Sequence, residues 1–155
     1  VKESYLRGLA DAYIQSNSLM SSTVLDNLLT FLKSKDKNLL ETSLNQAFSY
    51  IPYSLWQKEN EQYYHALVHL LFSLLGVYIF SEVQTQKGRT DSIVIFENEV
   101  FIFEFKLDKS AEEAFFQIER KDYAEQYKDS GMPVYKVGVN FSSEKKAIEE
   151  VVCQL

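Results

Sequence analysis

Cysteine is almost absent from the sequence, in which Cys153 stands alone. A single cysteine excludes an internal disulfide framework and fits a reducing compartment, so we expect a cytoplasmic protein. Apolar runs of the roughly 18 residues that a membrane-spanning helix needs are also missing. The first residues, VKESYLRGL, lack the apolar core of a secretory signal peptide. The chain begins with Val1 rather than methionine, and we therefore expect it to be part of a longer protein.

A phosphate-binding glycine loop of the type G-x-x-x-x-G-K-[ST] is missing as well, so this chain by itself is not expected to bind a nucleotide. The formal net charge is −6 and the pI is near 5.0, which argues against a protein that coats nucleic acid by electrostatic attraction. An enzyme that reaches phosphates through metal ions remains compatible with this balance, because such a site is itself acidic. Apolar residues, in contrast, are plentiful at 46%, enough for a packed core.

Residues 1 to 51 show helical spacing of apolar side chains and no strand-like alternation. The predicted helices cover about residues 5–14, 22–32 and 38–49. Pro52 closes the third helix. This stretch carries no chemical signature, so we interpret residues 1–55 as a helical connector and residues 56–155 as the domain that carries function.

The second part of the sequence alternates between helical and strand patterns. The predicted elements are a helix over 58–75, strands over 77–84, 91–96 and 100–107, a helix over 109–129, a strand over 134–141 and a final helix or strand pair from residue 144. This α-β-β-β-α-β order predicts a mixed α/β fold that contains a hairpin.

The predicted hairpin, GRTDSIVIFENEVFIFEFK, brings charges together in an otherwise apolar segment. With Glu97-Asn98 as a two-residue turn, Asp91 lies opposite Glu104 and Arg89 lies opposite the lysine at position 106. Like charges that face each other destabilise a strand pair, unless a cation lies between them. Carboxylate oxygens from two adjacent strands suit Mg²⁺ or Mn²⁺. We therefore predict a divalent metal bound by Asp91 and Glu104.

Lys106 lies on the same strand face as Glu104, because strand side chains repeat every two residues. A lysine beside a carboxylate-bound metal can orient or deprotonate an attacking water, or neutralise a phosphate oxygen. The pattern thus indicates metal-assisted hydrolysis of a phosphodiester. The alternative is that these charges form cross-strand salt bridges on a solvated face. A three-residue turn would moreover place Asp91 opposite Phe105 and break the cluster.

Together these motifs resemble the PD-(D/E)xK nuclease superfamily, which is built on the same α-β-β-β-α-β core. Asp91 matches the aspartate that enters the second strand, and Glu104-Phe105-Lys106 matches the E-x-K. The strings E-x-x-Y-H, G-R-x-D, E-F-K and Q-I-x-x-K-x-Y, within about residues 56–145, are most similar to a bacterial and archaeal subgroup. Members of this subgroup are fused behind an AAA-ATPase-like domain. The sequence departs from the superfamily where Thr90 replaces a frequent proline, and where the Q-x-x-x-Y pattern is not met.

The resemblance implies a restriction-endonuclease-like fold with a mixed sheet, preceded by a helical segment. It also implies a Mg²⁺- or Mn²⁺-dependent nuclease acting on nucleic acid, for which we expect DNA, with an AAA-ATPase-like domain N-terminal to it. Glu61 in the preceding helix would be a further catalytic acid and metal ligand, and Gln117 in the following helix would fix the lysine or the water. The alternative is a catalytically inactive domain that keeps the nuclease fold for interaction or regulation within a larger ATPase-fused protein.

Four residues are candidates for substrate binding, namely Arg89, Lys121, Tyr123 and His65. Arg89 resembles a position near the site in the subgroup, where it would contact a phosphate or pair with Glu104. Lys121 and Tyr123 follow Gln117 and would reach the substrate backbone, or else form a solvated helix face and a core tyrosine.

The helix that contains Glu61 also carries two histidines. Glu61, His65 and His69 recur every four residues on one helix face, which permits a zinc site. Alternatively, His65 orients Glu61 or contacts a phosphate, and His69 packs within the apolar stripe. Glu82, on the first predicted strand, is either a further acid of the site or part of a solvated face.

Overall fold

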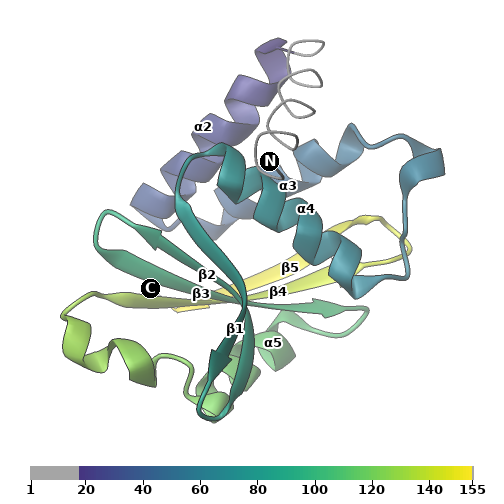
Figure 1. The fold of residues 1–155 in the computed structure, drawn as a ribbon. Coiled ribbons are helices and arrows are strands. Elements are labelled where there is room, and N and C mark those ends of the chain that lie inside the picture. Colours follow the sequence, from purple (N-terminus) through teal and green to yellow (C-terminus); the bar gives the residue numbers. More distant parts are fainter. Residues whose placement is uncertain (1–17, 155) are drawn as a thin grey trace, which may run out of the picture.

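The computed structural model of the chain describes residues 18–154, so the helix predicted near residues 5–14 lies outside the described residues. A five-stranded sheet in the order β1-β2-β3-β4-β5 forms the centre of the molecule (Figure 1). The strands are β1 (Tyr78–Thr85), β2 (Gly88–Phe96), β3 (Glu99–Leu107), β4 (Val134–Ser142) and β5 (Ala147–Gln154). Strands β3 and β4 are parallel, whereas the other neighbouring pairs are antiparallel. The predicted α/β fold with a mixed sheet is confirmed.

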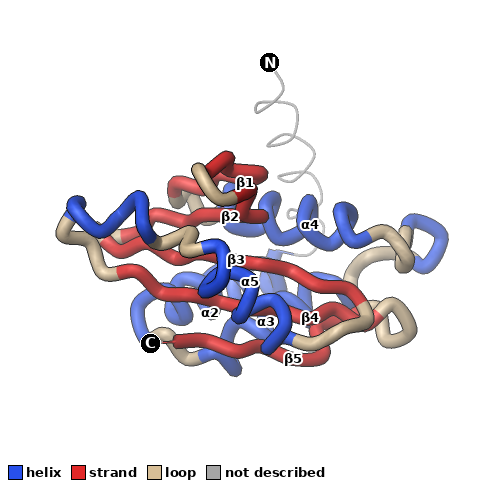
Figure 2. Tube along the Cα trace, turned by 90° about the horizontal axis from the view of Figure 1, so that it is seen from below, coloured by secondary structure: helices blue, strands red, loops and turns tan. Residues whose placement is uncertain are grey.

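Helices cover both faces of this sheet. They are α2 (Ser18–Ser34), α3 (Lys37–Ser49), α4 (Glu61–Leu74) and α5 (Ala111–Lys121), with short 3-10 helices η1 (Tyr53–Leu55) and η2 (Glu125–Ser130). Helices α2, α3 and α4 lie above the sheet in Figure 1 and α5 lies below it, in front of the strands in Figure 2. None of the helices in the described part of the chain has the length and apolar character needed to cross a membrane.

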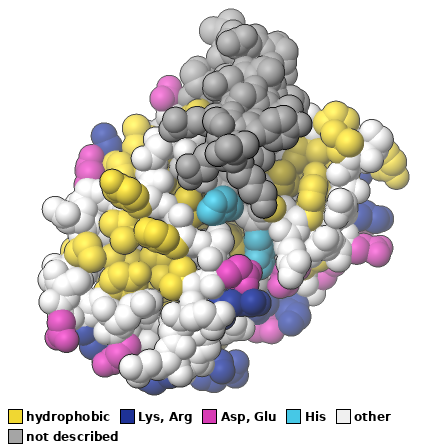
Figure 3. All heavy atoms as spheres, in the orientation of Figure 1, with side chains coloured by type: hydrophobic (Ala, Val, Ile, Leu, Met, Phe, Trp, Pro, Cys, Tyr) yellow, Lys and Arg dark blue, Asp and Glu magenta, His cyan; other side chains and the backbone are white. Residues whose placement is uncertain are grey.

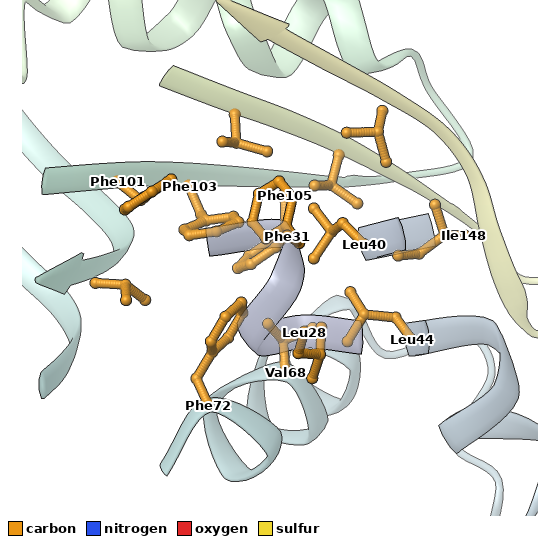
Figure 4. Packing of buried hydrophobic residues seen from close by; sticks show 14 of the residues in the cluster. Leu28, Phe31, Leu40, Leu44, Val68, Phe72, Phe101, Phe103, Phe105 and Ile148 are labelled. Atoms are coloured by element: carbon orange, nitrogen blue, oxygen red, sulfur yellow. The ribbon is translucent and has the colours of Figure 1, made fainter. Parts of the chain in front are cut away.

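The larger core lies between the sheet and α2, α3 and α4. Alternation along β3 sends Phe101, Phe103 and Phe105 toward these helices, as Figure 4 shows. The ring of Phe31 on α2 lies 6.0 Å from Phe101 and 6.5 Å from Phe103, and the ring of Phe72 on α4 lies 5.4 Å from Phe103. The helices that we interpreted as a connector therefore pack against the sheet within one shared core.

Two predicted elements differ from the structure. The helix predicted over 109–129 ends at Lys121, because Asp122 adopts a left-handed backbone with φ +49°. The chain then turns so that Tyr123 is buried against Ile93 and Ile118. The segment after residue 144, which we left open between a helix and a strand pair, forms the single strand β5 antiparallel to β4.

Helix α5 packs closely against β4, and a glycine makes this possible. A Cβ atom at Gly138 would lie 2.3 Å from the carbonyl oxygen of Ala111 and 2.6 Å from the backbone nitrogen of Phe115. The Ser110 side chain caps the start of α5 by accepting from the Glu113 N–H, and the Glu150 carboxylate accepts from the Ala111 N–H. These contacts fix α5 over the end of β3, where Gln117 is needed.

Candidate active site

The site lies at a fork between β2 and β3. Their ladder runs from Phe96 paired with Glu99 to Ser92 paired with Phe103, and it ends there. Strand β3 continues along β4 as far as Leu107, while β2 leaves it and stays paired with β1 alone. The end of β3 that carries Glu104 and Lys106 is therefore open on the β2 side.

The predicted turn and register are found. Glu97 and Asn98 form the two-residue turn with φ values of +48° and +64°, as a tight hairpin requires. The expected facing pairs Asp91–Glu104 and Arg89–Lys106 are nevertheless wrong, because the ladder stops before them. Like charges would face each other at both positions, and the strands separate at the first of them.

Asp91 bridges the fork with its side chain. Its carboxylate oxygen Oδ2 accepts a hydrogen bond from the Phe105 N–H at 2.8 Å. The carboxyl group is largely buried, and this burial raises its pKa, although the Phe105 N–H and the Lys106 charge oppose the shift. The two acids of the predicted metal site therefore remain neighbours without being a ladder pair.

Glu104 is the most deeply buried charged side chain of the site, at 1% exposure. Its Oε1 atom accepts from the Gln117 amide and lies 3.4 Å from the Lys106 ammonium, whereas its buried Oε2 atom has no hydrogen-bond partner among the described residues. Burial, followed by the negative charge of Asp91, raises the pKa of Glu104 to about 8, against the opposing effect of Lys106. The Lys106 charge near Oε1 does not offset this shift, and the buried Oε2 atom is left without a partner among the described residues.

His65 lies next to the fork on the face of the sheet that α4 covers. Its Nε2 atom lies 3.8 Å from Asp91 Oδ2, and its ring lies 4.8 Å from the ring of Phe105. Both ring nitrogens are buried, and neither has a hydrogen-bond partner in the described part of the chain. Burial lowers the pKa of His65, which favours the neutral imidazole that binds metals. Figure 3 shows histidine side chains beside acidic and basic groups at the middle of this face.

Glu82 reaches the same place from β1. Its backbone is left-handed, with φ +57°, and it interrupts the ladder between the pairs Ser81–Ser92 and Val83–Thr90. Ligand atoms of His65, Glu82 and Asp91 all lie within 4.8 Å of one another. Arg89 lies 2.6 Å from the Glu82 carboxylate, and thus pairs with this residue rather than with Glu104.

These donors fit a divalent cation. Two carboxylates and a neutral imidazole converge, whereas Glu104, the other acid of the predicted metal site, does not belong to this group although its buried Oε2 atom is unpartnered. Carboxylate oxygens and imidazole nitrogen are both ligands of Mn²⁺-like ions, and Mg²⁺ accepts the carboxylates with water. A cation bound in this group would occupy one ring nitrogen of His65, which has no partner among the described residues.

The remaining predicted residues lie around this cluster. Glu61 is the first residue of α4, one turn before His65, and its charge acts to raise the pKa of that histidine. His69 is hydrogen-bonded to the Ser81 hydroxyl at 2.6 Å. Neither Glu61 nor His69 belongs to the group of ligand atoms within 4.8 Å, so the alternative zinc set is not brought together among the described residues.

Tyr123 and Lys121 contact the start of β2. The Tyr123 hydroxyl donates to the Arg89 carbonyl oxygen at 2.6 Å, and its side chain is 2% exposed. Lys121 lies against Gly88. Both residues therefore support the segment that carries Arg89, and Tyr123 does so from within the core.

From the sequence, Glu82 is either a further acid of the site or part of a solvated face, and the structure places its carboxylate in the group with His65 and Asp91. Glu82 reaches this group because its backbone is left-handed within a strand. The segment YIFSEVQT contains no glycine or asparagine that would predict this conformation.

A profile of the PD-(D/E)XK nuclease superfamily matches residues 59–151, a span that includes α4, all the site residues and most of β5. The chain belongs to the PD-(D/E)XK nuclease superfamily. This membership indicates a nuclease-type function, and nucleases of this superfamily typically use divalent metals.

A relative from Azotobacter chroococcum mcd 1, named "Uncharacterized protein in vnfD 5'region", is 31% identical over 156 residues. The match covers 96% of this chain and 30% of the relative, so the chain spans less than a third of that protein's length. No solved structure matches the chain significantly.

Proposed function

We propose that this PD-(D/E)XK domain is a metal-dependent nuclease that hydrolyses phosphodiester bonds in DNA. The observation that carries the proposal is the buried pair Asp91 and Glu104, which share a fork, have raised pKa values and leave one carboxylate oxygen unpaired. Two such acids in one buried place favour a bound cation over a structural role, because nothing else there offsets their charge fully.

Asp91 and Glu104 would hold Mg²⁺ or Mn²⁺, and His65 and Glu82 offer further ligand atoms close by. Glu61, one helical turn before His65, would act through a water molecule. When bound, the ion would stabilise the negative charge that develops on the scissile phosphate and lower the pKa of a bound water.

The neighbouring side chains have distinct tasks in this proposal. Gln117 donates to Glu104 Oε1, which holds the carboxylate in place and leaves Oε2 directed away from the amide. Lys106, 3.4 Å from the same Oε1 atom, is placed to position the attacking water or to contact a phosphate oxygen. Arg89 and Lys121 lie on the more exposed rim, where they would bind phosphates of the substrate backbone.

A nuclease assay on duplex and single-stranded DNA with Mg²⁺ or Mn²⁺ tests this function. Asp91→Asn and Glu104→Gln keep the side-chain shapes, and we expect each to reduce the rate at least about 100-fold, as removal of a transition-state charge partner does. Asp129→Asn, an exposed acid on η2, is the matched control and should cut at the wild-type rate. Equal activity of wild type and Asp91→Asn would discard the assignment, and inactivity of all variants without metal binding would favour the non-catalytic alternative.

From the subgroup resemblance we also propose that an AAA-ATPase-like domain precedes this domain in the full-length protein. ATP hydrolysis by the full-length protein, absent from the isolated domain, tests this arrangement. Full-length protein without ATPase activity or ATP binding would contradict it.

A further inference from the structure

The carboxylate of Glu82 lies between two positions for positive charge. On one side, Arg89 Nε lies 2.6 Å from Glu82 Oε2. On the other side, a Glu82 oxygen lies within 4.8 Å of ligand atoms of His65 and Asp91. One acid therefore serves both as the partner of an arginine and as a potential metal ligand.

The backbone at Glu82 indicates that this placement is functional. A glutamate at φ +57° is strained, and glycine or asparagine would occupy the position at lower cost. The ladder to β2 pairs Ser81 with Ser92 and Val83 with Thr90, yet skips the pair Glu82–Asp91 between them. The interrupted pair brings two carboxylates to the cluster at the expense of regular strand geometry.

Another cation can readily replace Arg89 as the partner of Glu82, because the ion pair between them is exposed. Its side chains are 42% and 53% exposed, and an exposed ion pair of this kind is weak because solvent screens it. A divalent cation bound among His65, Glu82 and Asp91 would attract the Glu82 carboxylate and repel the guanidinium beside it. Arg89, at the exposed edge of the fork, would then be free to bind a phosphate through the planar set of N–H donors on its guanidinium group.

We propose that Arg89 and the metal ion compete for Glu82, so that metal binding releases Arg89 to bind a phosphate of the nucleic acid. This inference rests on the proposed function. It assigns Glu82 as a metal ligand contributed by a strained position of β1, and Arg89 as a substrate-binding residue that becomes available only in the metal-bound protein.

Calorimetric titration with Mn²⁺ tests the competition without any catalysis. Arg89→Gln should bind Mn²⁺ about two- to five-fold more tightly than wild type, the factor expected for loss of an exposed competing ion pair. Glu82→Gln should bind it more weakly, and in the Glu82→Gln background Arg89→Gln should have no further effect. Lys145→Gln removes an equally exposed, ion-paired cation from the turn before β5 and should leave the affinity unchanged.

Fluorescence anisotropy with a hydrolysis-resistant phosphorothioate DNA duplex tests the release. In Mn²⁺, Arg89→Gln should weaken DNA binding and reduce the slope of log affinity against log salt by about one. Without metal, wild type and Arg89→Gln should bind the duplex equally, because Arg89 is held by Glu82. Circular dichroism confirms that each variant is folded.

The outcomes separate this inference from the proposed function. If wild type binds Mn²⁺ and Arg89→Gln binds it equally well or more weakly, the competition is ruled out and the nuclease assignment still stands. A DNA affinity that Arg89→Gln lowers equally with and without Mn²⁺ overturns the release. Absence of Mn²⁺ binding by the wild type overturns both the inference and the metal-dependent function beneath it.

Discussion

Glu104 is destabilising in its ionised form when no metal is bound. Burial and the charge of Asp91 raise its pKa from an ordinary value of 4.5 to about 8 in the folded protein. A group whose pKa is higher in the folded state contributes stability below its unfolded value, and this contribution is lost as the pH rises through the folded value. The metal-free protein should therefore lose stability between about pH 4.5 and 8.

We predict that Glu104→Gln stabilises the metal-free protein at high pH. The amide is neutral throughout, so in the presence of a chelator the free energy of unfolding at pH 9 should exceed that of wild type by on the order of 3 kcal/mol. The difference should shrink toward pH 5, where Glu104 in the fold is protonated. Urea denaturation across this pH range measures it, and parallel curves for the two proteins would contradict the assigned cause.

A second prediction concerns Cys153 on β5. Burial raises the pKa of its thiol from 9.0 to about 11, although Lys37 opposes the shift. Because the thiolate is the reactive form, alkylation by iodoacetamide at pH 8 should be at least ten times slower in folded than in urea-unfolded protein, and should accelerate toward pH 11. Equal rates in both states would show that the thiol is not held in a buried site.

The residue types and the two-residue repeat of a strand are enough to predict which residues form much of the candidate site. Asp91, Glu104 and Lys106 follow from a two-residue turn and alternation along the strand, and Lys106 and Glu104 indeed lie 3.4 Å apart. Their catalytic roles stay predictions. The separation of β2 from β3 was not predicted, because we expected a cation to offset the repulsion between the facing acids, whereas Asp91 instead accepts from the Phe105 N–H.

At the scale of elements, the placement of α5 depends on the space above Gly138. We predict that Gly138→Ala costs about 1–3 kcal/mol of stability, because the new methyl group would meet the backbone of Ala111 and Phe115, neither of which moves independently of the helix. Displacement of α5 should also separate Gln117 from Glu104 and lower nuclease activity. Urea denaturation and the DNA assay measure the two effects.

Gly131→Ala is the informative comparison for this variant. Gly131 has φ +71° and meets nothing within 4 Å, so its substitution carries the backbone cost alone. It should leave activity intact in the folded protein. Equal activity losses in the two variants would show that α5 packing has no particular link to the site.

The ends of the helices were harder to predict than the presence of the helices. Periodic apolar residues predicted a helix over 109–129, but the left-handed Asp122 ends α5 and lets Tyr123 reach the Arg89 carbonyl. That hydrogen bond joins segments 34 positions apart, which no local pattern records. The order of the elements from α4 to β4, in contrast, follows from hydrophobic period and turn residues and was predicted correctly, whereas the last element was left open.

At the scale of the whole molecule, the helical segment and the sheet share one core. Phe31 on α2 is fully buried against the rings of Phe101 and Phe103 on β3. We predict that Phe31→Ala lowers the free energy of unfolding by about 3–5 kcal/mol. Because one core unfolds cooperatively, circular dichroism and the fluorescence of Trp56 should report the same transition. Two separate transitions would instead show that residues 18–49 fold independently of the sheet.

The fork separates the end of β3 that carries Glu104 and Lys106 from the tip of the β1–β2 hairpin. Beyond Ser92, β2 pairs with β1 as far as the turn at Gln86 and Lys87, where Lys87 also pairs with Asp122, while Glu104 and Lys106 stay paired with β4. Residues inserted at the tip should therefore lengthen the stretch of DNA that the domain protects in footprinting, while the affinity for Mn²⁺ stays constant. In the nuclease proposed above, changes to this one exposed turn would therefore alter the DNA that is bound and leave the cation site unchanged.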